Sequence, residues 1–329
     1  TMANVNCMDP KNIKSIAVIG TGSVGASWAS LFLAKGIKVH AYDKQPDAEK
    51  KAHAFVEGAW PALRELGVTK LAKPELSLLT FFGNIKEAVY EVDVVQENVY
   101  EDLELKREVL EEIESGISAS TLVISSTGGI PPTELQKSCR NPGRFVVVHP
   151  FNPSHLIPLV EVVDGEKTEP EVVNWALKFA RFLHKEPVHV KMETSGHLTN
   201  RLQFALVKEA VACLVEGVAS ASDIDRAVRY GLAPRWMLMG SLLTLHLAGG
   251  EGGMKGILDH AGQAIESWWT PRMVPKLDEK MIQLLANISS EVSSEQDVQD
   301  WVKWRDEQLV NVLNLQSQSH KTEPSNKAA

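Results

Sequence analysis

The sequence of 329 residues has few cysteines, and the three present, Cys7, Cys139 and Cys213, lie far apart. They form no CxxC pair and have no histidine neighbours at metal-ligand intervals, so neither a disulfide framework nor a metal site is predicted. A reducing compartment is therefore the expected environment.

The sequence also lacks a run of about 18 apolar residues, the length of a membrane-spanning helix, and a charged leader followed by an apolar core. Lysine and arginine number 34 against 42 aspartates and glutamates, which gives a net charge of −8. This excess of acid argues against nucleic-acid and anionic-membrane partners. We expect a cytoplasmic protein with a small ligand.

What is present is an alternation of strand-like and helical segments over the first part of the chain. Short apolar runs predict buried strands, and apolar residues at helical spacing predict helices between them. The predicted strands are 13–20, 39–42, 78–81, 93–96, 122–125 and 145–148, and the predicted helices include 23–35, 47–66 and 102–115. This order favours an α/β fold of Rossmann type, with a doubly wound, mainly parallel sheet.

The pattern changes near residue 192, after which helical periodicity continues to about residue 315. Boundary or N-cap signals occur at Thr194, Ser220 and Ser294. We predict a Rossmann domain over 13–192, an all-helical C-terminal domain over 193–315, and a disordered polar tail over 316–329.

A glycine-rich turn joins the first predicted strand to the first helix. In Gly20-x-Gly22-x-x-Gly25, the first glycine permits the tight turn, the second lets the backbone approach a pyrophosphate, and the third allows close helix-strand packing. The helix start at Ser23 and Val24 offers N–H groups to phosphates. The turn is thus typical of a dinucleotide site.

An acidic residue stands where such a site needs one. Asp43 follows the second predicted strand, about 20 residues after the turn. A carboxylate there accepts hydrogen bonds from ribose hydroxyls and repels a 2′-phosphate. The combination predicts NAD rather than NADP, although the adjacent Lys44 weakens that preference.

A histidine and a glutamate are candidates for proton transfer. His149 follows strand 145–148, at the edge where doubly wound sheets bind ligands, and Glu161 lies in the apolar run 159–163. An unpaired carboxylate in such a strand is costly, so the two side chains are expected to pair. The glutamate would fix the imidazole tautomer while the other nitrogen takes a hydroxyl proton. On residue types alone, a structural histidine and a surface glutamate fit equally well.

With these motifs, the sequence resembles the 3-hydroxyacyl-CoA dehydrogenase superfamily. The likeness rests on His149-Pro-Phe-Asn-Pro, Pro158-Leu-Val-Glu-Val, Thr199-Asn-Arg-Leu and the glycine turn. Within the superfamily it is similar to the branch that contains lambda-crystallin, an L-gulonate 3-dehydrogenase, and L-carnitine dehydrogenase. The resemblance implies NAD as cofactor and a homodimer formed by the helical domains.

The resemblance also implies roles for individual residues. His149 is the implied general acid and base, Glu161 its orienting partner, and Asn200 a hydrogen-bond donor to the substrate. Glu101 and Lys106 match positions on the nicotinamide side of the site. A helix start and an exposed lysine are the alternative explanation for these last two residues.

One position departs from the family pattern. Gly128 occupies a place in the loop 126–130 where the family usually has a serine that hydrogen-bonds the reacting oxygen. Losing such a donor costs on the order of 3 kcal/mol in the transition state, unless the hydroxyl of Ser126 or Thr127 replaces it. We predict that these three residues contact the substrate.

The helical domain supplies a candidate carboxylate clamp. Arg235 lies in a segment that resembles the branch acting on free hydroxy acids, and it can form two parallel hydrogen bonds to a carboxylate. An arginine bonded to helix carbonyls or across a subunit interface is the alternative. Only Lys70 and Lys73 are available in the stretch 66–74 to meet nucleotide phosphates, which disfavours a CoA thioester.

Tryptophans of the helical domain allow two interpretations. Trp236, Trp268 and Trp269 can form an aromatic box for a quaternary ammonium group, which carnitine would need, although core or dimer packing explains such residues more often. The segment 301–309, with two further tryptophans and Leu309, is predicted to be a packing stripe and a candidate dimer surface.

The leading prediction is an NAD-dependent oxidoreductase that acts on the 3-hydroxyl of a small L-3-hydroxy acid such as L-gulonate. The alternatives are an L-carnitine or 3-hydroxyacyl-CoA dehydrogenase, a non-redox acid–base catalyst suggested by Gly128, and a binding or structural protein.

Overall fold

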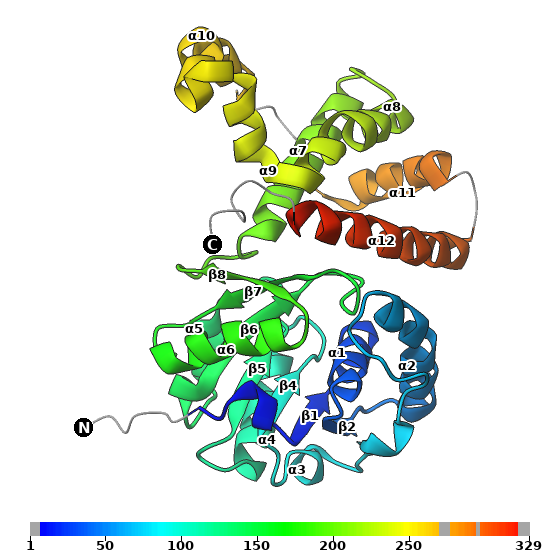
Figure 1. The fold of residues 1–329 in the computed structure, drawn as a ribbon, viewed down its shortest axis with the longest axis vertical. Helices are drawn as coiled ribbons and strands as arrows, with labels where there is room; N and C mark the ends of the chain where they lie inside the picture. The colour runs from blue at the N-terminus through cyan, green and yellow to red at the C-terminus, as the bar shows by residue number, and fades with distance from the viewer. Residues whose placement is uncertain (1–6, 270–276, 294–296, 322–329) are drawn as a thin grey trace. The chain divides into compact units, whose positions relative to one another are not determined.

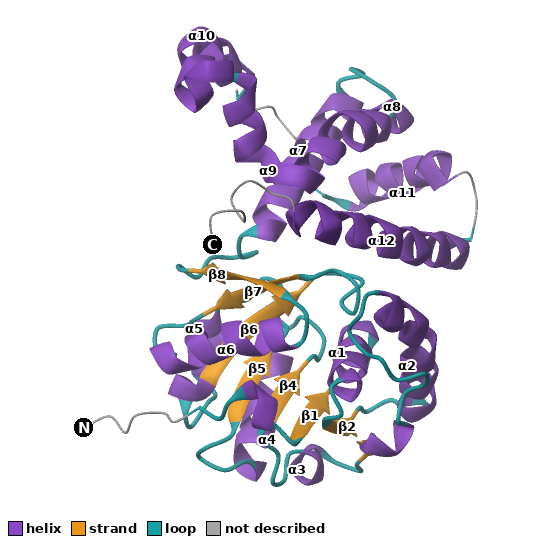
Figure 2. Ribbon diagram, viewed as in Figure 1, coloured by secondary structure: helices purple, strands orange, loops and turns teal. Residues whose placement is uncertain are grey.

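The computed structural model describes residues 7–269, 277–293 and 297–321. The chain divides into two compact units, Thr1–Leu202 and Gln203–Ala329, which we call the sheet unit and the helical unit. Within the described residues, all strands belong to the sheet unit (Figure 2). The boundary follows Leu202 instead of residue 192, because hydrogen bonds tie the segment after residue 192 to the sheet unit, among them Thr133 N–H to Glu193 and Gly196 N–H to the Gly129 carbonyl.

The sheet confirms the predicted Rossmann-type fold. Its order is β3-β2-β1-β4-β5-β6-β7-β8, and each neighbouring pair is parallel except the antiparallel pair β6–β7. The strands are β1 (Ser15–Ile19), β2 (Lys38–Tyr42), β3 (Leu79–Phe81), β4 (Val94–Glu97), β5 (Leu122–Ser125), β6 (Phe145–Pro150), β7 (Leu159–Val163) and β8 (Glu186–Val190).

Helices cover both faces of the sheet because its strands are apolar on both sides (Figure 1). In β1, Ile16 and Val18 pack on one face, whereas Ala17 and Ile19 pack on the other. The first face is covered by α1 (Ser23–Ala34), α2 (Ala48–Glu65) and α6 (Pro170–Phe182), and the second by α3 (Ile85–Ala88), α4 (Leu103–Gly116) and α5 (Pro132–Gln136).

Parallel strands bring their carboxyl ends to one edge of the sheet. β1, β4 and β5 pair in register, so the glycine turn after β1, the loop after β4 and the loop 126–130 after β5 meet at this edge. The fold thereby gathers segments that are more than a hundred residues apart in the sequence.

The helical unit contains α7 (Thr199–Val215, which begins in the sheet unit), α8 (Ala221–Ala227), α9 (Ala233–Ala248), α10 (Gly253–Trp268), α11 (Glu279–Ser293) and α12 (Val298–Lys321). Ser220 caps α8 as its side chain predicts, since its hydroxyl accepts the Asp223 N–H. Thr194 starts no helix, because α7 begins at Thr199. Ser294 lies outside the described residues.

The predicted disordered tail is wrong in its first part. α12 continues to Lys321, so residues 316–321 are helical, and the Gln316 side chain donates a hydrogen bond to the Met237 carbonyl. Residues 322–329 lie outside the described part of the chain.

Two features of the described residues bear on ligand classes. No helix among them is both long and apolar enough to cross a membrane. No group of three or more histidine, cysteine, aspartate or glutamate side chains among them is arranged to hold a metal ion.

Candidate active site

The glycine turn leaves an open space at the start of α1. Gly20 has a φ of +85°, and a Cβ there would stand 2.9 Å from the Asn98 carbonyl oxygen. A Cβ on Gly25 would overlap the Gly20 carbonyl oxygen, whereas one on Gly22 would meet no atom within 4 Å. No side chain caps α1, so its first N–H groups are available to a phosphate. The turn therefore fits a pyrophosphate.

The predicted ribose-binding carboxylate lies beside this turn. Asp43 follows β2, and its Oδ2 atom accepts the Thr21 N–H at 2.7 Å while its Oδ1 atom accepts the Gln45 N–H at 3.0 Å. Ser23 and Val24 form the first turn of α1, as expected. These contacts hold a negative charge next to the phosphate cradle, which fits NAD better than NADP.

His149 and Glu161 form the expected pair. They lie opposite each other in the antiparallel ladder of β6 and β7, and the His149 Nδ1 atom is 2.9 Å from Glu161 Oε2. Glu161 is fully buried, and its other oxygen accepts the backbone N–H groups of Leu198 and Thr199 at 3.1 and 2.6 Å. Burial raises the pKa of the Glu161 carboxyl, but hydrogen bonds from His149 and Thr199 outweigh burial and hold this pKa below its ordinary value.

Asn200 lies in the first turn of α7, on the sheet unit, next to the loop after β5. Its Nδ2 atom donates a 2.9 Å hydrogen bond to the Gly128 carbonyl. A Cβ on Gly128 would stand 3.0 Å from His149 Nε2 and 3.6 Å from Asn200 Nδ2. The imidazole nitrogen that Glu161 does not bind therefore faces the same small volume as the Asn200 amide.

His197 also belongs to this site, although the sequence analysis missed it. Its ring is fully buried, its Nε2 atom donates to the Thr127 carbonyl at 3.1 Å, and its centroid lies 5.5 Å from that of His149. Burial lowers the pKa of His197, against the hydrogen bond to Thr127. No sequence signal marks this residue, because a lone histidine before a helix has many structural explanations.

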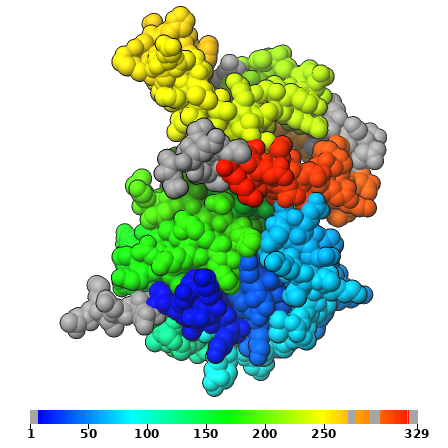
Figure 3. Space-filling view, viewed as in Figure 1, coloured from blue at the N-terminus to red at the C-terminus, as the bar shows by residue number. Residues whose placement is uncertain are grey.

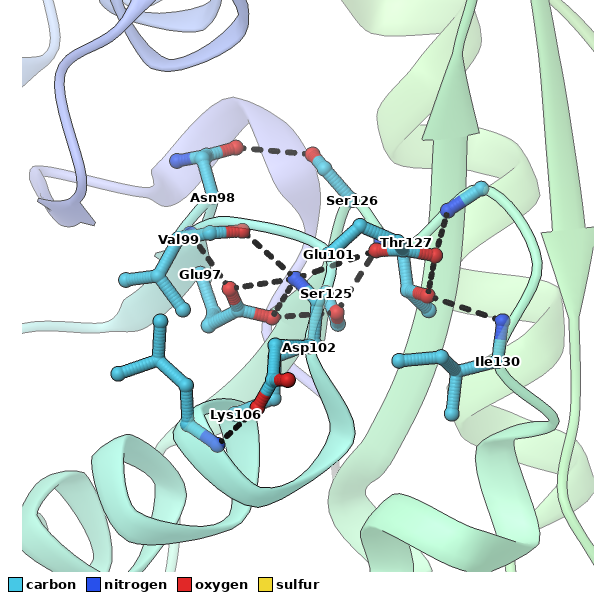
Figure 4. Close-up of polar contacts among 12 residues, drawn as sticks. Glu97, Asn98, Val99, Glu101, Asp102, Lys106, Ser125, Ser126, Thr127 and Ile130 are labelled. Carbon is cyan, nitrogen blue, oxygen red and sulfur yellow. Dashed lines mark hydrogen bonds and ion pairs between the residues drawn. The ribbon is translucent and has the colours of Figure 1, made fainter. Parts of the chain in front are cut away.

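Glu101 anchors the loop that contains Gly128. Its Oε1 atom accepts the Thr127 hydroxyl at 2.6 Å and the backbone N–H groups of Gly128 and Gly129 at 3.0 Å each. Figure 4 shows Glu101, in the loop after β4, beside Thr127. The carboxylate thus fixes the loop through three donors, in addition to the bond from Asn200.

Lys106 is buried, so the exposed-lysine alternative is wrong. Its Nζ atom lies 2.9 Å from Glu97 Oε1, 2.9 Å from the Val99 carbonyl and 3.6 Å from Glu101 Oε2 (Figure 4). The side chains of Lys106 and Glu97 are 1% and 0% exposed. Lys106 therefore supports Glu101 from the protein interior, and its place beside the nicotinamide stays a prediction.

Glu97 is a second residue that the sequence analysis missed, yet a signal exists. It ends β4, whose four residues are all buried, and the cost of an unpaired carboxylate applies there as it does for Glu161. Its Oε2 atom accepts the Ser125 hydroxyl at 2.5 Å, and its Oε1 atom accepts the Val99 N–H at 2.6 Å.

Neither hydroxyl beside Gly128 is free to replace the missing serine. The Ser126 hydroxyl donates to Asn98 Oδ1 at 2.8 Å and accepts the Trp28 indole N–H at 2.9 Å. The Thr127 hydroxyl donates to Glu101. Both hydroxyl hydrogens are used within the protein, so in this arrangement neither side chain takes the place of the serine.

The predicted substrate residues of the helical unit do not form one cluster, whereas those of the sheet unit do. Arg235 is exposed on α9, and its Nε atom donates to the Gly231 carbonyl at 3.1 Å, as one alternative had it. Trp268 and Trp269 are exposed at the end of α10, and among the described residues no ring contact joins them to Trp236.

The predicted stripe in α12 is partly formed. The rings of Trp301 and Trp304 meet edge to face with centroids 5.5 Å apart, yet both side chains are partly exposed. Leu309 is half-buried. The stripe packs within α12 and also leaves apolar surface uncovered.

Two family descriptions match the chain. "3-Hydroxyacyl-CoA dehydrogenase, NAD binding domain" matches residues 15–194, and "3-hydroxyacyl-CoA dehydrogenase, C-terminal domain" matches residues 196–284. Together they cover the sheet unit and much of the helical unit, and they agree with the open glycine cradle.

Similar proteins include an L-carnitine dehydrogenase of Streptomyces griseus, 40% identical over 304 residues that cover 92% of this chain and 90% of the relative. An L-carnitine dehydrogenase of Bacillus cereus is 38% identical, with coverage of 95% and 96%. The relatives are matched over nearly their whole length.

Solved structures show the same architecture. A 5-formyl-3-hydroxy-2-methylpyridine 4-carboxylic acid 5-dehydrogenase, described as an NAD+-dependent dismutase, aligns with a TM-score of 0.80 and 28% identity over 93% of this chain and 99% of its own. A 3-hydroxybutyryl-CoA dehydrogenase of Escherichia coli aligns with a TM-score of 0.62 and 29% identity over 79% of this chain and 54% of its own.

The fold, the cradle and these matches agree on cofactor and class. NAD is the cofactor, and the reaction is the oxidation of a hydroxyl group on a 3-hydroxy acid. The chain belongs to the 3-hydroxyacyl-CoA dehydrogenase family and is an NAD-dependent dehydrogenase.

Proposed function

We propose that the chain oxidises the 3-hydroxyl of L-carnitine, a free 3-hydroxy acid, and that His149 is its general acid and base. The observation that carries the chemical part is the buried His149–Glu161 pair, 2.9 Å apart, with the second imidazole nitrogen facing the loop at Gly128. The choice of L-carnitine is supported by the relatives of that activity at 38–40% identity.

Each residue of the pair has a separate task. Glu161 accepts the Nδ1 hydrogen and so presents Nε2 as the acceptor for the hydroxyl proton. The Asn200 amide donates a hydrogen bond to the same oxygen as charge develops there. Bound NAD would supply the hydride acceptor, and the glycine turn at Gly20, Gly22 and Gly25 would hold its pyrophosphate.

The substrate preference differs from the L-gulonate expected from the sequence. L-carnitine adds a quaternary ammonium group, which aromatic faces attract, and its carboxylate suits a guanidinium. Trp236, Trp268 and Trp269, with Arg235, are the candidates for these contacts. Trp268, Trp269 and Arg235 are exposed and Trp236 is half-buried, and we propose these four residues as substrate contacts on their chemistry alone.

We also propose that the protein is a homodimer. Most residues of α9 are apolar, and none of its sixteen residues is buried. Figure 3 shows the residues of α9 and α10, in yellow, at the surface of the view. A second copy would cover leucines that are otherwise exposed to water.

The decisive experiment offers a panel of alcohols with NAD and records NADH absorbance. The panel contains L-carnitine, D-carnitine, L-gulonate, 3-hydroxybutyrate and 3-hydroxybutyryl-CoA. We expect kcat/KM for L-carnitine to exceed every other value by at least about tenfold, which is about 1.4 kcal/mol. A higher value for L-gulonate or the CoA ester would reject L-carnitine, and no NADH from any of them would favour a non-redox function.

The His149→Gln variant tests the proposed general acid and base in the same assay. Its kcat/KM should fall about a thousandfold, while it should still bind NADH.

A further inference from the structure

The segment 197–200 holds the proton-transfer pair and the loop 126–130 at the same time. The two backbone N–H groups that follow His197 donate to Glu161. The Asn200 amide and the His197 ring each donate to a backbone carbonyl of the loop. The proposed function gives Glu161 and Asn200 a task, but it gives none to the His197 ring.

His197 keeps a side chain where the backbone favours glycine. Its φ is +49°, in the left-handed region, and the preceding Gly196 lies in the same region at +77°. Residues with a side chain adopt this conformation at an energetic cost, although histidine does so more often than most. The ring is nevertheless fully buried. Contacts made by the ring must therefore offset the cost of the backbone.

The hydrogen bond to Thr127 fixes which nitrogen of the His197 ring carries a hydrogen. A carbonyl oxygen can only accept, so Nε2 is protonated, and in the neutral ring Nδ1 is then a bare acceptor. Nδ1 is buried, and among the described residues it has no hydrogen-bond partner. A second proton on the ring would place an unpaired donor in the interior, which is costly. The geometry thus favours a neutral ring.

The groups around the ring agree with this assignment on balance. Burial lowers the pKa of His197 most, and the neighbouring His149 lowers it further. The hydrogen bond to Thr127 raises this pKa, as do the carboxylates of Glu161 and Glu101, yet the net shift is downward. His197 is therefore neutral near physiological pH.

A neutral ring matters because of where it lies. The ring centroids of His197 and His149 are 5.5 Å apart, and His149 becomes a cation when it accepts the hydroxyl proton. A second cation at this distance would oppose that step. A neutral His197 does not oppose it, and its N–H group keeps the loop at Gly128 beside His149 Nε2.

We propose that His197 is a positioning residue for proton transfer: as a neutral N–H donor it holds the Thr127 carbonyl, and it leaves the uptake of the proton to His149. This inference rests on the proposed role of His149. It explains why a buried histidine occupies a backbone position that favours glycine. A ring without nitrogen would pack there but would leave the carbonyl without its donor.

Two substitutions separate the donor from the ring. His197→Gln retains an N–H donor near the place of Nε2 and cannot take up a proton, whereas His197→Phe retains an aromatic ring and has no donor. We expect kcat for L-carnitine to fall about tenfold in His197→Phe and to stay within about threefold of the wild type in His197→Gln. KM for NAD should stay within about twofold in both, because neither substitution touches the glycine turn.

His40 provides a matched control in the same unit. Its ring, on β2, also donates to a backbone carbonyl, that of Ala88 at 3.3 Å. His40→Phe therefore removes the same kind of bond away from His149. We expect this variant to keep the kcat of the wild type. Binding of NADH by each variant, measured by calorimetry, would show that it is folded.

A second measurement reads the charge of the ring without turnover. Nitrogen-15 NMR distinguishes a neutral imidazole protonated at Nε2 from an imidazolium, and the spectrum of His197→Gln identifies the His197 signals by their loss. From about pH 6 to pH 8 we expect these signals to remain those of the neutral Nε2–H form. A purely structural ring would carry no such requirement.

Several results would overturn the proposal. These are a His197 ring that gains its second proton in this pH range, a wild-type kcat in His197→Phe, an equal loss of kcat in His197→Gln and His197→Phe, or the same loss in His40→Phe. An active wild type together with a fully active His149→Gln variant would instead reject the proposed function. A wild type that oxidises no member of the panel would reject both.

Discussion

Two apolar helices, one in each unit, differ in what surrounds them. α1 buries nine of its twelve residues in the sheet unit, whereas α9, with sixteen, buries none in the helical unit. Trp28 and Phe32 of α1 are almost fully buried, while Leu242 of α9 is 74% exposed. The sheet unit completes its own core, whereas the helical unit leaves apolar side chains of α9 exposed.

Charged residues show the same contrast. In the sheet unit, Lys106 and Glu97 form an ion pair with side chains at most 1% exposed, and this pair supports the loop that faces His149. In the helical unit, the pair of Lys255 and Asp259 is 84% and 64% exposed. Buried pairs become costly when one partner is lost, whereas exposed pairs contribute little.

The largest expected effect tests this contrast in charge. Lys106→Met leaves Glu97 buried without its cation, so the free energy of unfolding should fall by about 3–5 kcal/mol in urea titrations. Lys255→Met removes the same charge from an exposed helix pair and should leave the unfolding midpoint unchanged. Equal effects of the two variants would contradict the comparison. A stable Lys106→Met protein with full activity would remove Lys106 from the support of Glu101.

The sheet unit could be predicted well from the sequence because its signals are local. The apolar runs give seven of the eight strands to within a few residues, with β8 missed, and the glycine turn lies where its spacing indicates. We predicted that Glu161 pairs with His149 because an unpaired carboxylate in a buried strand is costly, and this argument needs only the burial of the strand. The register of β6 and β7 then places the two side chains opposite each other.

The rest of the site depends on contacts that no local pattern encodes. His197 reaches Thr127 over seventy residues, and Glu101 reaches the backbone of Gly128 and Gly129. The loss of a serine at position 128 could be seen in the sequence, but the direction of its missing Cβ could not. The polar composition of residues 316–321 predicted disorder, but α12 continues through them.

Lys185 is a second buried lysine of the sheet unit, and its burial makes the free energy of unfolding depend on pH. Lys185 donates to the carbonyls of Ser154 and Ile157 at 2.6 and 2.8 Å, and in the described part of the chain no ion pair reaches it. Burial lowers the pKa of Lys185 from 10.5 to about 7. The unfolded chain therefore binds more protons than the folded one between these two values.

Because of this difference, wild-type stability should rise with pH relative to a Lys185→Met variant. From pH 7 to pH 10 the difference in unfolding free energy between the two proteins should change by on the order of 3 kcal/mol, in favour of the wild type at high pH. Below pH 7 both states hold the proton, and the difference should be flat. A difference independent of pH across this window would mean that Lys185 keeps its proton in the folded protein.

The smallest expected effect concerns the uncovered face of α9. Leu242→Glu places a charge on this face, which should weaken self-association at least about tenfold if a second copy covers it, as sedimentation equilibrium would measure. Leu71→Glu makes the same substitution at a half-exposed leucine of the sheet unit and should leave the association constant unchanged. A monomeric wild type, or equal weakening by both variants, would place the partner of α9 elsewhere. Loss of association without loss of L-carnitine turnover would mean that each copy carries a complete site, whereas joint loss would mean that the helical units complete the site only in pairs.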